Sequence, residues 1–175
     1  TLQNLTVFNA RSIANEACNN ASSLVNVDLS QSINLQSIGN YAFQLCSKLE
    51  NVYLPGDTEN PNNYETSSVL ESIGNYAFAY TESLVHITLQ EGLRTMGEYA
   101  FVGTENKRSI LPYVTLPTTL TSVGKYAYAY NGLTKITINN KVISDHMFYE
   151  NDELVDIKVP KQVNSVGDYA FARCD

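Results

Sequence analysis

The stretch Ser37-Ile38-Gly39-Asn40-Tyr41-Ala42-Phe43 recurs along this chain of 175 residues. Seven copies of it, five close and two diverged, begin at Ser12, Ser37, Ser72, Thr95, Ser122, Val142 and Ser165. Self-similarity at a short and nearly constant period is typical of proteins that stack one structural unit on the next. The sequence therefore predicts a repeat architecture rather than a domain built around one central core.

A second pattern, L-x-x-Φ-x-Φ with Φ an aliphatic residue, alternates with the first. Its leading leucines are Leu2, Leu24, Leu49, Leu84, Leu111, Leu133 and Leu154. Apolar residues at every second position predict a short strand with one buried face. Most units are 21–25 residues long, and the two longer ones carry their excess in the polar segments 55–68 and 105–110, which are typical of loops.

One strand per unit places successive strands side by side and parallel in a solenoid. The recurring stretch must return the chain along the other side. We expect its glycine where the backbone turns or approaches closely, followed by about one helical turn with Ala and Phe pointing inward. No unit buries its apolar side alone, so stacking supplies the core. The predicted fold is an α/β solenoid, mainly β, of about seven units with one parallel sheet on its concave side.

We expect residues 1–175 to form a single domain with an insertion at 55–68. Residues 172–175 stop in the middle of a unit and carry no polar capping segment. Because solenoids end on atypical polar units, the chain is expected to be a fragment of a longer array.

A small polar or thiol residue stands three positions after the Phe position in six units. This column contains Cys46, Thr81, Thr104, Asn131, Asn151 and Cys174. Such side chains can satisfy backbone groups that a narrow solenoid leaves without strand partners. We therefore expect Cys46 and Cys174 to be buried structural thiols, and Cys18, at a Phe position, to lie in the core. Three cysteines without a CxxC pair predict neither a disulfide framework nor a zinc site.

Charge and motifs argue against several function classes. A formal net charge of −7 without a cluster of Lys or Arg argues against nucleic acid as a partner. No run of 18 apolar residues is present, so no membrane insertion is expected. Motifs of the types G-x-S-x-G, H-E-x-x-H and Gly-rich phosphate loop are absent. His86 lies on a predicted strand, and His146 is interpreted as a satisfied surface histidine. We expect no enzyme activity, no metal and no cofactor.

The clearest repeat units, Ser37–Pro55 and Ser165–Asp175, carry the patterns L-x-x-Φ-x-Φ-P and S-Φ-G-x-Y-A-F-x-x-C. This combination resembles the BspA-like (treponemal-type) leucine-rich repeats over essentially the whole chain, although the Cys position is often Thr or Asn and two copies lack the glycine. The resemblance implies a right-handed superhelix on a protein exported to a microbial surface. It also implies an extracellular location and, as in several members, adhesion to proteins of the host matrix or of other cells.

Candidate binding residues lie on the outward side of the strands, at the second and fourth positions after each leading leucine. Tyr53, His86 and Tyr113 fall there on three consecutive strands, with Lys135 and Asp156 at their rim. Tyrosine is a favoured contact residue because it brings a large area and a hydroxyl at low rotamer cost. The simpler interpretation is that these residues only fit a solvent-exposed sheet face. We expect a protein-protein interaction module for adhesion, and the alternative is a passive spacer that holds another domain away from a surface.

Other features are favoured as parts of the scaffold. The insertion at 55–68 is the other candidate for binding, because insertions in solenoids often carry binding residues. The spacing of its Asp57, Glu59 and Glu65 fits no calcium loop, and the favoured interpretation is a flexible connector. The tyrosines of the close copies recur at one position and are interpreted as packing residues: Tyr41, Tyr76, Tyr99, Tyr126 and Tyr169. Asn4 and Asn20 begin glycosylation sequons, which are relevant only in a eukaryotic source.

Overall fold

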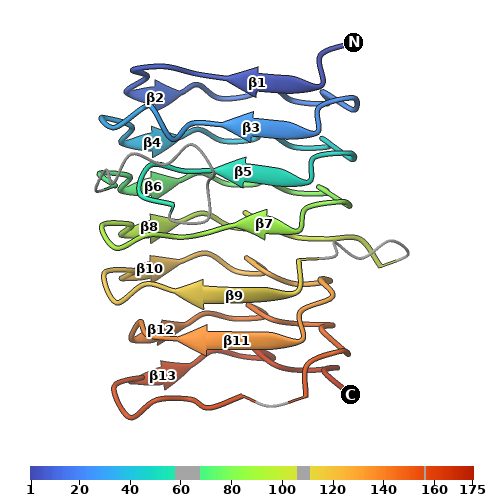
Figure 1. Cartoon of the computed structure of the whole chain (residues 1–175). Helices are drawn as coiled ribbons and strands as arrows, with labels where there is room; N and C mark the ends of the chain where they lie inside the picture. The colour runs from blue at the N-terminus through green and yellow to red at the C-terminus, as the bar shows by residue number, and fades with distance from the viewer. Residues whose placement is uncertain (58–67, 106–110, 156) are drawn as a thin grey trace.

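The chain winds into a stack of coils, each made by one repeat unit (Figure 1). The computed structural model describes residues 1–57, 68–105, 111–155 and 157–175. The first unit lies at one end of the stack and the last at the other, so neighbouring coils bring together residues more than 20 positions apart. No helix is found among the described residues, and hence none that is long and apolar enough to cross a membrane.

The L-x-x-Φ-x-Φ pattern forms a first column of short parallel strands. Its members are β1 (Asn4–Thr6), β3 (Asn26–Asp28), β5 (Asn51–Tyr53), β7 (His86–Ile87), β9 (Tyr113–Leu116) and β11 (Lys135–Ile138). Identical positions of successive units face each other, as Val27 and Val52 do across β3 and β5. Burial alternates along each strand, so that in β9 Val114 is buried and Tyr113 is exposed. The predicted parallel strands with one buried face are confirmed.

The recurring stretch forms a second column of parallel strands, which the expectation of a single sheet did not include. Its members are β2 (Ser12–Ile13), β4 (Ser37–Ile38), β6 (Ser72–Ile73), β8 (Thr95–Met96), β10 (Ser122–Val123), β12 (Val142–Ile143) and β13 (Ser165–Val166). Ile38 is buried and pairs with the buried Ile73 of the next coil. The second column forms because each of these two-residue segments lies beside the equivalent segment of the neighbouring coil and pairs with it.

The Tyr-Ala-Phe segments form turns instead of the expected helical turn, so the solenoid is mainly β, as predicted, but without a helical part in the described residues. Most of these segments have two residues with positive φ, as Tyr76 (55°) and Tyr80 (62°) do, whereas the segment of Tyr99 (56°) has one. A residue in this region cannot continue a right-handed helix. The N–H groups of Tyr76 and Phe78 instead donate to the carbonyls of Glu98 and Ala100 in the next coil, at 2.9 and 2.7 Å. We call this series of segments the turn column.

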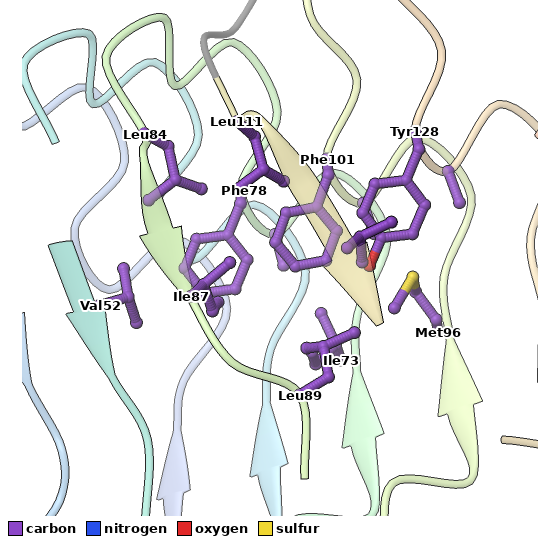
Figure 2. Packing of buried hydrophobic residues seen from close by; sticks show 14 of the residues in the cluster. Val52, Ile73, Phe78, Leu84, Ile87, Leu89, Met96, Phe101, Leu111 and Tyr128 are labelled. Atoms are coloured by element: carbon purple, nitrogen blue, oxygen red, sulfur yellow. The ribbon is translucent and has the colours of Figure 1, made fainter. Parts of the chain in front are cut away.

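The core lies inside the coils and continues from one coil to the next (Figure 2). Phe78 stacks on Phe101 with 5.0 Å between ring centroids, and Phe101 stacks on Tyr128 at the same distance. Side chains in and just before the strands, such as Ile87 and Leu84, pack around these rings. Each ring is thus buried by the coils above and below it, which is how stacking supplies the core.

The stack makes about six turns rather than seven. The seventh unit begins at Leu154, but the described residues of its L-x-x-Φ-x-Φ pattern form no strand, and Asp156 lies outside the described residues. Leu154 is still buried and Ile157 packs against the core, whereas the side chain of Val155 is 91% exposed.

The first column is interrupted between β7 and β9. Strands β1, β3, β5 and β7 form one sheet, and in the described part of the chain β9 pairs only with β11. In other coils the residue after the leading leucine donates its N–H to the preceding coil, as Val85 does to Glu50 at 3.0 Å and Thr134 does to Pro112 at 2.9 Å. Pro112 holds this position in its own coil and has no N–H to donate. The missing donor gives a physical reason for the interruption.

Successive coils approach most closely at the glycine of the recurring stretch. A Cβ atom at Gly97 would lie 2.4 Å from the backbone nitrogen of Asn75, and one at Gly124 would lie 2.2 Å from that of Glu98. The residue after the glycine adds a hydrogen bond between coils: the Asn75 N–H donates to Oδ1 of Asn40, at the same position of the preceding coil, at 2.8 Å. The expected close approach at the glycine is confirmed.

We predict that Gly97→Ala lowers the free energy of unfolding by about 1–3 kcal/mol, because the added methyl group forces two coils apart. Ser144 holds the glycine position of its unit and already carries a Cβ atom. Ser144→Ala removes only the hydrogen bond from its hydroxyl to the Gly124 carbonyl (2.9 Å), at a cost of about 1 kcal/mol or less. Urea unfolding followed by circular dichroism compares the two variants. Equal stability of Gly97→Ala and the parent contradicts the close contact.

Tyr128 replaces phenylalanine in the core stack, and its hydroxyl is buried without a hydrogen-bond partner in the described residues. We predict that Tyr128→Phe raises the free energy of unfolding by about 1 kcal/mol, because it removes an unsatisfied polar group. Burial also raises the pKa of this phenol. The parent therefore keeps its full stability below a pH of about 10 and loses stability as the pH rises further, whereas Tyr128→Phe lacks this loss.

Urea unfolding at neutral pH and again above pH 10 measures both effects. Tyr99→Phe is the matched control, because the Tyr99 side chain is only half-buried and its substitution is expected to change stability little. A Tyr128→Phe variant that is less stable than the parent shows that the hydroxyl has a partner.

Candidate functional site

The candidate site lies on the outward side of the first column, which we call the strand face. Its first three coils carry an asparagine ladder, in which Asn26 Nδ2 donates to Asn4 Oδ1 at 2.7 Å and Asn51 Nδ2 donates to Asn26 Oδ1 at 2.8 Å. The ladder stops where β7 brings His86 opposite Asn51. From β5 onward the strand face also carries aromatic, basic and hydroxyl side chains.

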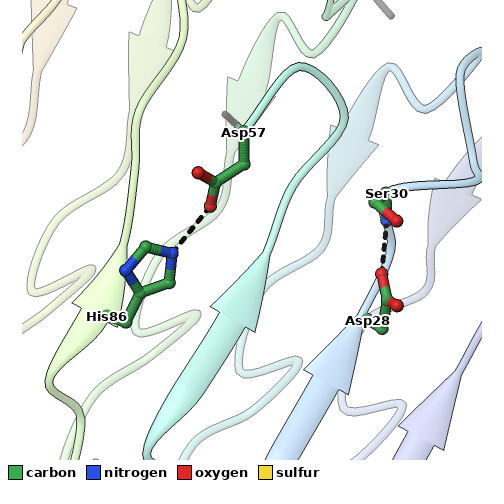
Figure 3. A network of polar contacts seen from close by, with 4 residues as sticks. All are labelled: Asp28, Ser30, Asp57 and His86. Atoms are coloured by element: carbon green, nitrogen blue, oxygen red, sulfur yellow. Dashed lines mark hydrogen bonds and ion pairs between the residues drawn. The ribbon is translucent and has the colours of Figure 1, made fainter. Parts of the chain in front are cut away.

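Tyr53 and His86 are in contact on the strand face, with ring centroids 5.1 Å apart. His86 Nε2 lies 2.8 Å from Oδ2 of Asp57, whose side chain is fully buried (Figure 3). Asp57 follows β5 in a tight turn, and its N–H donates to the Leu54 carbonyl at 3.1 Å. The first residues of the 55–68 insertion therefore lie against the strand face and orient the His86 ring.

Asp28 lies one coil earlier, on β3, in register with Tyr53. Its Oδ1 accepts the N–H of Ser30 at 3.0 Å, so this carboxylate bonds within its own turn (Figure 3). Asp57 instead reaches across to the next strand. Of the three acidic residues weighed for cation binding, Asp57 faces a histidine, and Glu59 and Glu65 lie outside the described residues.

Tyr113 and Lys135 lie opposite each other on β9 and β11. The Tyr113 side chain is 46% exposed. Next to these two residues the strand face is hollowed by a depression of about 380 Å³ that Thr115 and Thr137 also line. A second depression of about 610 Å³ lies between β11 and the residues Val155, Lys158 and Pro160, and Lys135 lines it as well. Lys135 therefore stands between two concave parts of the surface.

The structure places the predicted binding residues in two groups. One contains Tyr53 and His86, and the other contains Tyr113 and Lys135. No strand pairing is described between β7 and β9, which separates the groups, and Asp156 lies outside the described residues. The sequence analysis missed the contact of Asp57 and both depressions, because they depend on how residues of different coils lie relative to one another.

The aromatic residues of the turn column stack on one another, which confirms their interpretation as packing residues. Ring centroids follow at 5.2, 4.8 and 5.0 Å through Tyr41, Tyr76, Tyr99 and Tyr126. His146 continues this series at 4.4 Å from Tyr126 and 5.0 Å from Tyr169. Its Nδ1 is buried without a hydrogen-bond partner in the described residues, so the interpretation of a satisfied surface histidine was wrong. His146 serves as one ring of the stack.

The polar and thiol column bonds to backbone carbonyls, as predicted. Cys46 Sγ donates to the Cys18 carbonyl at 3.1 Å, and Thr81 Oγ1 donates to the Phe78 carbonyl at 2.8 Å. Cys46 is fully buried, and burial raises the pKa of its thiol to about 11. Cys18 and Cys174 are only partly buried, in contrast to the prediction, because they lie in the first and last coils and have one neighbouring coil each. Across the described part of the chain, no three His, Cys, Asp or Glu residues gather as a metal site.

We predict that Ellman's reagent at pH 8 modifies Cys18 and Cys174 of the native protein well before Cys46. Burial blocks access to Cys46, and its raised pKa leaves little of the reactive thiolate at this pH. Cys46→Thr imitates Thr81 of the next coil and is expected to keep both fast-reacting thiols. Reaction of all three thiols at one rate in the native protein contradicts the buried position of Cys46.

Comparison with known proteins places the chain in a family. The sequence matches the BspA type leucine rich repeat region in six copies, over residues 1–65 and 58–175. The chain belongs to the BspA-type leucine-rich repeat family. This match confirms the resemblance that the L-x-x-Φ-x-Φ and S-Φ-G-x-Y-A-F patterns indicate. A search of curated proteins finds no significant match.

Two solved structures share the fold of this BspA-type chain. The leucine-rich repeat protein TpLRR of T. pallidum superposes with a TM-score of 0.81 at 24% identity, over 99% of this chain and 77% of that one. A leucine-rich repeat protein from Bacteroides ovatus superposes with a TM-score of 0.70 at 21% identity, over 98% of this chain and 49% of that one. These likenesses confirm the leucine-rich-repeat solenoid.

Proposed function

We propose that this chain is a non-enzymatic protein-binding module whose strand face attaches to a protein partner. Leucine-rich repeat proteins generally mediate protein-protein interaction, which supports the general class. Parallel strands in register hold outward side chains at a fixed spacing. A partner therefore meets a surface that is ordered before binding, and little conformational entropy is lost on this side.

The observation that carries this proposal is the pair of tyrosines on the strand face. Tyr53 packs on His86, which Asp57 orients, and Tyr113 stands exposed beside the depression of about 380 Å³. Binding hot spots are enriched in large aromatic side chains next to such depressions. Lys135, in register with Tyr113, and Asp156, at the equivalent sequence position of the next unit, complete the proposed rim.

We place this module outside a microbial cell, where it adheres to proteins of the host matrix or of other cells. Support for the location and the partner class comes from the BspA-type family, whose resemblance implies export to the cell surface. The formal net charge of −7 agrees with a protein partner rather than a nucleic acid.

One observation favours a second candidate function, a passive spacer. In the first three coils the outward side chains of Asn4, Asn26 and Asn51 bond to one another and are committed to the scaffold. A solenoid used only for its length needs such ladders and needs no aromatic patch. The two functions therefore differ in how they respond to changes at Tyr53 and Tyr113.

We predict that Tyr53→Ala combined with Tyr113→Ala lowers attachment to host matrix or cells at least about tenfold, because the two substitutions remove both aromatic anchors. Phe8→Ala is the matched control: Phe8 is an aromatic side chain that is 67% exposed and lies outside the strand-face patch. Retention of fluorescent protein on immobilised matrix measures attachment, and unfolding midpoints confirm that each variant is folded. Equal attachment of the double variant and the parent excludes the strand face. A folded parent that attaches to neither surface supports the spacer instead.

A further inference from the structure

One position of the turn column changes character in the middle of the stack. Two residues after the Phe position, successive units carry Leu45, Tyr80, Gly103, Tyr130, Glu150 and Arg173. The Tyr80 N–H donates to the Val102 carbonyl at 2.8 Å, and the Gly103 N–H donates to the Ala129 carbonyl at 3.0 Å. Gly103 is therefore in register between Tyr80 and Tyr130 and is the one residue of the three without a side chain.

The missing side chain leaves a notch that is one coil high. The stacked rings of the same three coils, Tyr76, Tyr99 and Tyr126, are separated by steps of 4.8 and 5.0 Å. A flat group at the level of Gly103 would therefore lie one coil step from the coil of Tyr80 and one from the coil of Tyr130. The structure has a depression of about 360 Å³ here, which Tyr80, Tyr130 and Glu105 line.

The notch has an apolar floor and an acidic opening. Val102 is buried at its base together with Ala79 and Ala129 of the neighbouring coils. Glu105 is exposed at the opening. The pKa of the Tyr130 hydroxyl is raised, first by burial and next by the Glu105 carboxylate. An apolar slot with a negative opening favours a flat cation over an anion.

The turn column already holds such a cation in its last coils. The guanidinium carbon of Arg173 lies 5.6 Å from the ring centroid of Tyr149, and its Nη1 lies 2.7 Å from Oε1 of Glu150. Glu150 and Arg173 occupy the same column as Gly103. A guanidinium over a tyrosine ring with a carboxylate at its edge combines cation–π attraction with a charge-assisted hydrogen bond.

We propose that the notch above Gly103 binds an arginine side chain of a protein partner, with the guanidinium stacked between Tyr80 and Tyr130 and paired with Glu105. Lysine fits less well, because its ammonium is a compact, strongly hydrated charge that does not stack. The notch lies on the turn column and shares no residue with the strand-face patch. Its test is therefore independent of the proposed adhesion.

The whole chain, labelled with ¹⁵N, is titrated with acetyl-Gly-Arg-Gly-amide and with the matching lysine peptide, and amide and tyrosine signals are followed by NMR. The expected result is a saturable shift of the Gly103 amide and of the Tyr80 and Tyr130 rings. The dissociation constant of the arginine peptide should be at least about fivefold lower than that of the lysine peptide. Equal shifts with both peptides overturn the proposal.

Two variants locate the binding. Gly103→Tyr fills the notch with the residue found in both neighbouring coils and should abolish the arginine-specific shifts. Glu105→Gln keeps the shape, removes the charge and should raise the dissociation constant about fivefold or more. Leu45→Tyr adds the same side chain to the same column outside the notch and should bind like the parent. If Gly103→Tyr does not fold, Glu105→Gln decides, and its binding at parental affinity overturns the proposal.

Two further titrations test other occupants. Stronger binding of acetyl-Gly-Tyr-Gly-amide or of a methyl glycoside than of the arginine peptide assigns the notch to a neutral ring and overturns the proposal. Lys107 and Arg108 follow Glu105 in the sequence. Arginine-specific shifts that persist in Lys107→Ala/Arg108→Ala support the proposal, and their loss assigns them to the segment 106–110 instead.

Discussion

The close backbone contact at the recurring glycine is the constraint on which the rest of this structure depends. At Gly97 and Gly124 the preceding coil leaves no room for a Cβ atom, so neighbouring coils are held at one distance and in one register. The strand columns, the core rings and the turn column therefore repeat at the same distance from coil to coil. The core rings of Phe78 and Phe101 and the outer rings of Tyr76 and Tyr99 stack at 5.0 and 4.8 Å. One backbone contact thereby sets the geometry of side chains on all sides of the coil.

Where the same residue recurs at the same position of neighbouring coils, the side chains bond to or stack on one another. Their polar groups and ring faces are then less available to a partner. The asparagines of β1, β3 and β5 bond to each other, and the stacked tyrosines cover one another's rings. Side chains become available where a column changes its residue. Asn51 is followed by His86 on the strand face, and Tyr80 is followed by Gly103 on the turn column. Function in such a stack is therefore expected at the irregular positions.

Changes in unit length act in the same way as changes in residue type. Asp57, at the start of the insertion after β5, places a buried carboxylate against His86. Pro112, after the other long segment, lacks the N–H that joins this strand to its neighbour in other coils. The strand face is consequently divided into a part held by Asp57 and a part that begins with Tyr113.

The sequence alone determined the features that follow from its period: the stacked units, the parallel strands with one buried face, the close approach at the glycines, and the bonding column that includes Cys46 and Thr81. Each depends on residues at fixed spacing within one unit, and the outward position of Tyr53, His86, Tyr113 and Lys135 follows in the same way. Only the tertiary structure decided the second strand column, the turns with positive φ at Tyr76 and Tyr80, the pairing of Asp57 with His86, and the notch between Tyr80 and Tyr130. These features depend on distances between coils and on the path of inserted segments, and such distances exist only once the units are stacked.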